Sequence, residues 1–298
     1  MRATFRTFGA AVLCVLSVSA PMPFAAAGEP ENAGTRVVTF NIRYNEPGNK
    51  ENAWANRKGM VAGTIRFLEA DLVGLQEVLK DQIADLEALL PEFGWTGVGR
   101  DDGKESGEFN PIFYRKKRFD VLSGSTFWLS ETPDVPGRKG WDAACPRIVT
   151  WIYLKDMDAK KTFHLFNTHF DHVGETARRE SAALVLRKVR EIAQGGPVIV
   201  TGDFNSVEED PVCRLLTSGT EKWPGLGDAR RLSVAPPYGS NHTFNGYSQD
   251  VYPGARIDFI FSRDTGPVLW YGVVSDKWDG RFVSDHNAVA ADIVIRKK

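Results

Sequence analysis

The chain has 298 residues and carries 37 lysines and arginines against 38 aspartates and glutamates, which gives a net charge of −1. Hydrophobic residues make up 42% and charged residues 25%, so the composition is that of an ordinary globular protein and excludes a disordered or fibrous chain. The near-balance of charge excludes a polybasic nucleic-acid-binding arm and an acidic tail. The length is compatible with one large domain or two modest ones.

The N-terminal segment has the order of features that is typical of a secretory signal peptide. Arg2 and Arg6 come first, an apolar run extends from Phe8 to Ala20, and residues 25–27 are three alanines of the kind found at cleavage sites. The apolar run is short for a helix that spans a bilayer, so an uncleaved membrane anchor is the weaker alternative. We therefore expect export to the periplasm or the extracellular space, without stable membrane insertion.

These features divide the chain into a signal peptide over residues 1–27, a short N-terminal lead over 28–35 and a folded domain over 36–298. Cleavage removes two arginines and no acid, which lowers the net charge from −1 to −3. Such a charge does not favour binding nucleic acid by bulk electrostatics, which needs clustered lysine and arginine. Cys145 and Cys213 remain, and the sequence leaves open whether they pair or are separate buried thiols.

Strand-like and helix-like segments alternate along the domain, without a repeat or a Pro-rich linker. Runs rich in Val, Ile, Phe and Tyr predict strands over residues 36–42, 72–76, 111–115, 147–154, 162–168, 198–201, 256–262 and 287–295. Apolar residues at helical spacing predict helices around residues 61–68, 83–90 and 182–192. Clusters of Gly and Pro predict long surface loops over residues 101–107, 133–140 and 223–239. The pattern predicts a single α/β domain.

Polar side chains gather at the ends of the predicted strands. They are Asn41, Glu77, His169, Asp203, Asn205, Asp285 and His286. Apolar strands that deliver amide, carboxylate and imidazole groups to their ends can build a polar site on a rigid floor. Singly, each of these residues is explained equally well by a turn or a helix cap.

Two acids do not fit that simpler explanation. Asp258 interrupts a predicted strand of Ile and Phe, where an unpaired carboxylate is expensive to bury. Glu77 directly follows a strand whose sequence predicts burial on both faces. Carboxylates suit Mg²⁺ or Mn²⁺, which need only one or two protein acids besides water and a substrate phosphate.

Taken together, the motifs resemble the endonuclease/exonuclease/phosphatase superfamily, whose fold is that of deoxyribonuclease I, and specifically a secreted bacterial member. The resemblance runs from about Arg36 to Ile295 and rests on six pieces in the same order: Thr39-Phe40-Asn41, Leu75-Gln76-Glu77-Val78, Asn167-Thr168-His169, Gly202-Asp203-Phe204-Asn205, Arg256-Ile257-Asp258-Phe259 and Ser284-Asp285-His286. The resemblance implies an α/β fold with a four-layer sandwich of two packed mixed β-sheets flanked by helices. The site is then expected at one rim.

The resemblance also implies a hydrolase that cleaves phosphoester bonds by water attack at phosphorus, with Mg²⁺ or Mn²⁺ as cofactor. Glu77 is then the principal metal ligand, with Asn41 and Asp285 nearby. A divalent ion suits this reaction because negative charge builds up on the phosphate oxygens as water attacks.

Catalytic roles follow from the same motifs. Asp203 would orient or deprotonate the attacking water, and Asn205 would donate a hydrogen bond to the phosphate. Asp258 and His286 would form a carboxylate–imidazole pair, in which the acid holds the ring and favours its protonated form. His169 occupies a position where family members carry His or Tyr.

Five further residues are predicted substrate or phosphate ligands: Arg147, Arg57, Asn110, His172 and His242. A guanidinium matches a phosphate with two parallel donors, although a surface salt bridge explains Arg57 equally well. Asn110 precedes a predicted strand, His172 extends the rim beyond His169, and His242 lies in a predicted loop.

Three alternatives remain beside this prediction. The segment His169-Phe170-Asp171-His172 partly fits a zinc hydrolase of the metallo-β-lactamase type, but five histidines poorly supply a two-zinc site. A non-catalytic binding module on the same fold is expected to lose some motif residues, whereas all six pieces are intact. The phosphoester substrate stays open between DNA or RNA, for a secreted nuclease, and a sugar- or lipid-linked phosphate. No obligate protein partner is evident from the sequence.

Overall fold

The computed structural model describes residues 4, 34–46, 48–222, 224–248 and 256–296. The predicted signal peptide lies outside the described residues apart from Thr4, and so does the predicted lead apart from Gly34 and Thr35. Within the described part of the chain, no helix combines the length and the apolar character that crossing a membrane requires.

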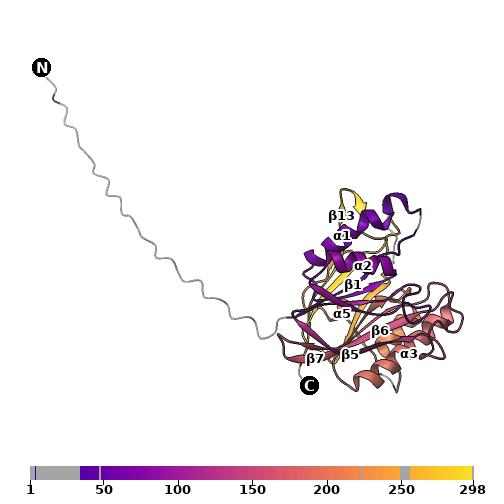
Figure 1. Cartoon of the computed structure of the whole chain (residues 1–298). Coiled ribbons are helices and arrows are strands. Elements are labelled where there is room, and N and C mark those ends of the chain that lie inside the picture. Colours follow the sequence, from indigo (N-terminus) through magenta and orange to yellow (C-terminus); the bar gives the residue numbers. More distant parts are fainter. Residues whose placement is uncertain (1–3, 5–33, 47, 223, 249–255, 297–298) are drawn as a thin grey trace. The chain divides into compact units, whose positions relative to one another are not determined.

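The first β-sheet has seven strands, in the spatial order β10-β12-β15-β1-β2-β4-β3. Figure 1 labels β1 of this sheet, and β5, β6 and β7 of the second sheet. Their bounds are Thr35–Asn41 for β1, Leu72–Gln76 for β2, Phe93–Thr96 for β3, Ile112–Arg115 for β4, Tyr238–Gly239 for β10, Val268–Val274 for β12 and Ala288–Ile293 for β15. Strand β1 pairs parallel with β2 and antiparallel with β15, so the sheet is mixed.

The second sheet has six strands, in the order β5-β6-β7-β8-β11-β9. Their bounds are Phe119–Trp128 for β5, Ile148–Asp156 for β6, Lys161–His169 for β7, Val198–Asp203 for β8, Gly227–Asp228 for β9 and Asp258–Arg263 for β11. This sheet is also mixed, because β7 and β8 are parallel while β8 and β11 are antiparallel. A separate two-stranded hairpin consists of β13, Lys277–Trp278, and β14, Arg281–Phe282.

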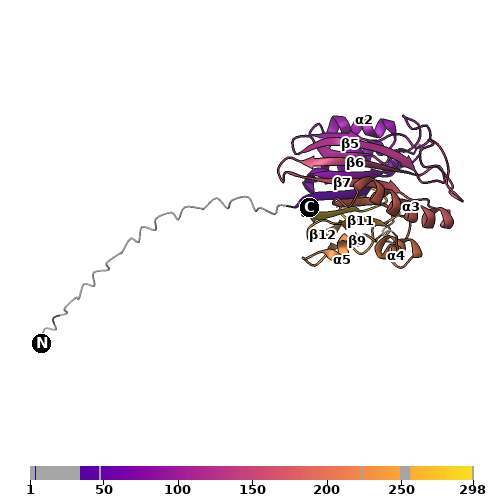
Figure 2. The same cartoon turned by 90° about the horizontal axis from the view of Figure 1, so that it is seen from below.

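Helices cover the outer face of each sheet (Figure 2). Helices α1, Trp54–Phe67, and α2, Lys80–Leu89, share a buried core with the first sheet. Helices α3, Glu175–Ala193, and α4, Pro211–Ser218, do the same for the second sheet. The two remaining short helices are the 3₁₀ helix η1, Lys50–Asn52, and α5, Ala229–Leu232.

The central strands are apolar on both faces because each face is covered. In β1, Val37 belongs to the core between the sheets, whereas Val38 belongs to the core beneath α1 and α2. In β8, Ile199 and Val200 divide in the same way between the inter-sheet core and the core beneath α3 and α4. Successive side chains of a strand point to opposite faces, so near-continuous apolar runs are what such a buried strand requires. The predicted four-layer sandwich is confirmed.

Several elements differ from the prediction. Strand β5 was not predicted because polar residues and a glycine interrupt its apolar residues. Six of its ten residues are exposed, as expected of a strand at the edge of a sheet. The predicted loop over 223–239 contains β9, α5 and β10, each only two to four residues long. Strands β3 and β12 and helix α4 also lie outside the predicted set. Asp258 begins β11 instead of interrupting a strand.

Buried polar side chains tie the two sheets together near the ends of β2 and β7. Asn167 Nδ2 donates to the Leu75 carbonyl oxygen at 2.7 Å, and Gln76 Nε2 donates to Asn167 Oδ1 at 2.7 Å. The Thr201 hydroxyl contacts the same Asn167 oxygen at 3.1 Å. A Cβ atom on Gly74 would lie 2.3 Å from Thr201 Oγ1 and 2.5 Å from Asn167 Oδ1, so the sheets approach too closely for any other residue there.

We expect Gly74→Ala to lower the free energy of unfolding by about 1–3 kcal/mol, because the added methyl group overpacks the contact between the sheets. Urea denaturation followed by circular dichroism measures this change. Gly59→Ala is the matched control, since Gly59 is an exposed residue of α1 and an added Cβ meets no heavy atom within 4 Å. The control should raise stability by up to about 1 kcal/mol. Equal stability of the two variants would contradict the close approach of the sheets.

Candidate functional site

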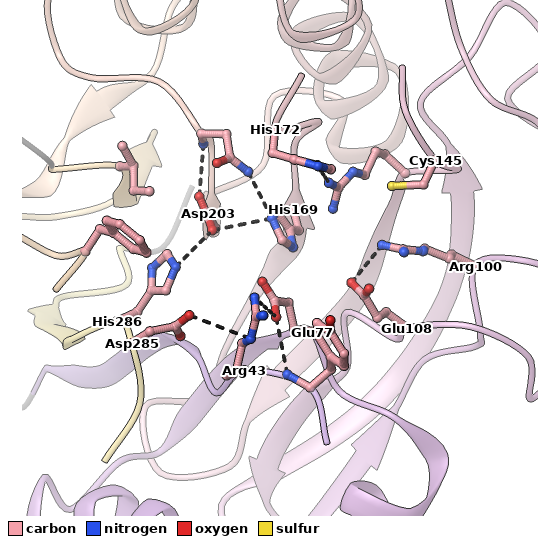
Figure 3. A pocket seen from close by; sticks show the side chains of 15 residues that line it. Arg43, Glu77, Arg100, Glu108, Cys145, His169, His172, Asp203, Asp285 and His286 are labelled. Atoms are coloured by element: carbon pink, nitrogen blue, oxygen red, sulfur yellow. Dashed lines mark hydrogen bonds and ion pairs between the residues drawn. The ribbon is translucent and has the colours of Figure 1, made fainter. Parts of the chain in front are cut away.

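A cavity of about 520 Å³ lies where the strands of both sheets end (Figure 3). Eight of the thirteen predicted site residues line it, namely Glu77, Arg147, His169, His172, Asp203, Asn205, Asp285 and His286. Asn41 and Asp258 are fully buried and contact lining residues directly. The structure therefore brings together ten predicted residues from distant parts of the chain.

Strand register places several of these residues side by side. The parallel pairing of β7 with β8 sets His169 opposite Asp203. The antiparallel pairing of β8 with β11 sets Asp203 opposite Asp258. In the first sheet, β1 pairs with β2 so that Asn41 lies opposite Gln76, the residue before Glu77. Convergence of the site is thus a consequence of sheet topology.

Three lining residues have left-handed backbone conformations where a strand gives way to a loop. They are Arg43, Glu77 and Asn205, with φ of 56°, 60° and 46°. Positive φ is uncommon for residues other than glycine and persists only where the surroundings enforce it. The turn after β2 directs the Glu77 carboxylate into the cavity, where it accepts a hydrogen bond from the Tyr44 backbone N–H at 3.2 Å.

Glu77 and Asp285 face the same guanidinium. Arg43 Nη1 lies 3.7 Å from Glu77 Oε2, and Arg43 Nε lies 3.8 Å from Asp285 Oδ2. Burial raises the pKa of Asp285, His286 and Arg43 oppose this effect, and the nearby Glu77 charge adds to it. Glu77 and Asp285 are buried carboxylates that line the same cavity, and such a pair requires positive charge nearby.

The donor set fits a hard divalent cation. Glu77 and Asp285 supply carboxylate oxygens, the ligands that Mg²⁺ and Mn²⁺ prefer. Asn41 Nδ2 donates to Glu77 Oε1 at 3.1 Å and to Asp203 Oδ2 at 3.0 Å, while Asn41 Oδ1 accepts from the Arg43 backbone N–H. In this orientation Asn41 lies next to the predicted metal ligand Glu77 and holds both acids through its nitrogen.

His286 connects two buried acids. Its Nδ1 donates to Asp258 Oδ2 at 2.9 Å, and its Nε2 lies 3.7 Å from Asp203 Oδ2. Burial opposes protonation of the ring, but the charges of Asp258 and Asp203 outweigh it and raise the pKa of His286 well above its ordinary value. Burial and the Asp258 charge raise the pKa of Asp203 to about 7. The arrangement holds a cationic imidazole beside a carboxyl group that exchanges its proton near neutral pH.

His169 is held as a neutral ring on the other side of Asp203. Its Nε2 lies 3.4 Å from Asp203 Oδ2 and accepts from Asn205 Nδ2 at 3.0 Å. Burial lowers the pKa of His169, and the positive charge of Arg147 adds to the effect. Asn205 Nδ2 also donates to the Phe170 carbonyl oxygen, and the Asn205 backbone N–H donates to Asp203 Oδ1 at 2.9 Å. Asn205 thus positions both His169 and Asp203, a contact set that differs from the predicted donation to phosphate.

Basic residues line the opposite side of the cavity. Arg147 Nε donates to Asp171 Oδ2 at 3.2 Å, and Arg147 Nη2 lies 2.8 Å from His172 Nδ1. Arg100 Nη1 donates to Glu108 Oε2 at 2.7 Å. No motif in the sequence pointed to Arg100 and Glu108, which flank a predicted surface loop.

Arg43 is the other charged lining residue that the prediction missed. It follows Asn41 by two positions at the end of β1, and this proximity to a motif was the one available signal. The sequence alone could not show that its backbone turns back toward Glu77.

The three remaining predicted substrate ligands are not among the described residues that line the cavity. The Arg57 side chain is buried, and its guanidinium donates four hydrogen bonds to backbone carbonyl oxygens, so it supports the fold. Asn110 is buried and donates to the Ile148 carbonyl oxygen at 2.9 Å. His242 lies outside the set of described residues that line the cavity.

Cys145 and Cys213 are separate free thiols. Cys213 lies on the buried face of α4, in the core that this helix shares with the second sheet, and burial raises its pKa to about 12. Cys145 is half-buried and lines the cavity. The question that the sequence left open is answered for the structure, since the thiols do not pair.

Comparison with known proteins places this site in a family. Residues 38–286 match the model of the endonuclease/exonuclease/phosphatase family. The chain is similar to a solved endonuclease/exonuclease/phosphatase structure from Bacteroides vulgatus, with 42% identity, a TM-score of 0.84, and coverage of 88% of this chain and 99% of that one. It is also similar to the mannosyl-6-phosphatase Bt3783 of Bacteroides thetaiotaomicron, with 36% identity, a TM-score of 0.82, and coverage of 88% and 100%.

A more distant relative is much longer than the region it shares with this chain. The uncharacterized protein R895 of Acanthamoeba polyphaga mimivirus is 26% identical over 277 residues, and the match covers 76% of this chain but only 39% of that protein. The family model nevertheless extends over most of the chain and includes every strand-end motif of the cavity. The chain belongs to the endonuclease/exonuclease/phosphatase family.

Proposed function

We propose that the chain is a divalent-metal-dependent phosphoesterase that cleaves P–O bonds by attack of water at phosphorus. The observation that carries this proposal is the continuous set of contacts within one cavity from Asp258 through His286, Asp203 and Asn41 to Glu77. The zinc-hydrolase alternative is wrong, because the chain belongs to a different family. A non-catalytic binding module has no support in a site that retains its acids and histidines.

Glu77 and Asp285 would hold the metal ion. When bound, Mg²⁺ or Mn²⁺ offsets the negative charge that develops on the phosphate oxygens. Arg43, which contacts both acids, adds a positive charge at the same end of the cavity. Asn41 keeps Glu77 and Asp203 at a fixed separation by donating to both.

Asp203 is the proposed general base. A base works best when its pKa lies near the operating pH, and burial brings Asp203 into that range. The hydrogen bond from the Asn205 backbone to Oδ1 leaves Oδ2 directed toward the two histidines. Oδ2 therefore accepts the proton of the attacking water in this proposal.

His286 is the proposed donor to a phosphate oxygen. Asp258 accepts from Nδ1 and keeps the ring protonated, so Nε2–H is available on the cavity side. A fixed cationic donor at the site of developing negative charge stabilises the transition state without reorganisation. Asn205 holds Asp203 in position through its backbone N–H. Its side chain also contacts His169, which lines the neighbouring part of the cavity.

For the substrate, we propose a small phosphomonoester with a sugar as its leaving group. Support comes from the 36% identity to a mannosyl-6-phosphatase across that whole chain. The balanced net charge of the sequence also gives no electrostatic advantage to a nucleic acid. We further propose that the protein acts after export, directed by the N-terminal signal peptide.

We expect hydrolysis of D-mannose 6-phosphate and p-nitrophenyl phosphate with Mg²⁺ or Mn²⁺, and little turnover of bis-p-nitrophenyl phosphate, plasmid DNA or RNA. Asp203→Asn should lower kcat by about 10²–10⁴, because it removes the general base with little change in shape. Phosphate release measures the monoesters and gel electrophoresis the nucleic acids. Asp120→Asn, at an exposed position of β5, should keep wild-type turnover. Plasmid nicking without monoester cleavage would favour a nuclease instead.

Metal binding is tested separately from turnover. Glu77→Gln should weaken Mn²⁺ binding by at least about tenfold, since it removes a charged ligand and keeps the size of the side chain. Isothermal titration calorimetry measures the affinity. Glu87→Gln, an exposed acid of α2, should leave it unchanged. Equal affinity of the Glu77 and Glu87 variants would place the metal elsewhere.

A further inference from the structure

We propose that the side of the cavity opposite Asp285 and His286 is a leaving-group subsite that recognises a hydroxyl-rich sugar. We call this surface the outer wall and define it by Arg100, Glu108, Arg147 and His172. Figure 3 shows Arg100 and Glu108 on one side of Glu77, with Asp285 and His286 on the other. The inference deepens the proposed function and rests on it, because it assigns the residues that select the sugar.

The Arg100 guanidinium has N–H donors that the bond to Glu108 does not use. The bond from Arg100 Nη1 to Glu108 Oε2, at 2.7 Å, is the one hydrogen bond of the Arg100 guanidinium among the described residues. Arg100 Nε is buried without a hydrogen-bond partner and lies 3.9 Å from Asp101 Oδ1, beyond hydrogen-bond distance. A guanidinium carries five N–H donors, so the bond to Glu108 leaves several of them without a partner among the described residues. The side chains are only 16% and 17% exposed and line the cavity.

Main-chain hydrogen bonds hold this pair in place. The Arg100 N–H donates to the Glu108 carbonyl oxygen at 3.0 Å, which closes a hairpin between the two residues. The Phe109 N–H donates to the Val78 carbonyl oxygen at 2.7 Å, which attaches the hairpin directly after the proposed metal ligand. The Trp128 indole donates to the Arg100 carbonyl oxygen at 2.6 Å. A binding group fixed in this way loses little conformational freedom when a ligand binds.

Arg147 and His172 extend the outer wall with further donors. Arginine has no acceptor atom, so at 2.8 Å His172 Nδ1 must accept from Arg147 Nη2, and a neutral His172 carries its hydrogen on Nε2. The His172 side chain is exposed and lines the cavity, so that Nε2–H is available to a ligand. Asp171 fixes Arg147 from behind at 3.2 Å.

A sugar fits this chemistry better than a nucleobase. Neighbouring hydroxyl groups both donate and accept, so one can donate to the Glu108 carboxylate while the next accepts from Arg100. Recognition of a base relies on stacking against an aromatic face. The aromatic side chains that line the described cavity are Tyr44, packed against Arg43, and Phe244, packed edge-on against His286. Both lie beside the proposed metal and phosphate residues, and the outer wall contains no Phe, Tyr or Trp.

The test measures binding by calorimetry in the Asp203→Asn background, where turnover is suppressed. The ligands are D-mannose 6-phosphate, phenyl phosphate and adenosine 5′-monophosphate, each with Mn²⁺. We expect Glu108→Gln and Arg100→Gln each to raise the Kd for mannose 6-phosphate, relative to that for phenyl phosphate, by about tenfold. His172→Gln, at an exposed position that does not hold the hairpin, should raise the same ratio severalfold.

Glu105→Gln is the matched control, because Glu105 lies on the same hairpin, is 71% exposed and pairs with Lys80 at the surface. It should leave the ratio of the two Kd values unchanged. An unchanged ratio in all three outer-wall variants, or no binding of mannose 6-phosphate, would overturn the subsite. The sugar assignment would be overturned if the outer-wall variants lost more affinity for adenosine 5′-monophosphate than for mannose 6-phosphate. Failure of the proposed function would appear differently, as absence of hydrolysis by the wild-type protein, because this binding assay needs no turnover.

Discussion

The polar tie between the two sheets is the constraint on which the geometry of the site depends. Asn167 bonds to the first sheet through the Leu75 carbonyl oxygen and Gln76, and Thr201 contacts the same amide from the second sheet. Glu77 comes directly after Gln76, and Asp203 lies two residues beyond Thr201. The distance between the sheets therefore fixes the separation of the two carboxylates that Asn41 bridges. Hydrogen bonds are directional, so they restrict the distance between the sheets to a narrower range than apolar packing alone does.

The hydrogen bonds between the sheets also concentrate negative charge in a small region. Four acids converge near one another, and most of their surface is removed from water: Glu77, Asp203, Asp258 and Asp285. The protein offsets this with the cationic ring of His286 and with Arg43, and with amide donors from Asn41 and Asn205. Buried carboxylates without such partners would destabilise the fold. A site of this composition is suited to a small, highly charged cation.

The strand pattern predicted an α/β domain, and the resemblance to the family implied its four layers. Ten of the predicted site residues meet because they lie at or beside the ends of strands. Apolar runs locate the strands, and a polar residue at the end of a strand is positioned by register, as His169, Asp203 and Asp258 are. What the sequence could not predict depends on loops and burial. Arg57 resembles a phosphate ligand until its burial is known, and Arg100 and Glu108 meet only because their hairpin folds onto Val78.

The attachment of that hairpin has an evolutionary consequence. Backbone groups at Val78, Gly99 and Phe109 make the bridges that anchor it, and such pairing places little demand on the side chains carried by the residues between. The chemistry displayed by this segment can therefore diverge, by substitution or by changes in length at its tip, while the acids and histidines behind it stay as they are. Related proteins would then differ in substrate preference through changes in this one short hairpin, while the residues proposed to carry out the reaction stay the same.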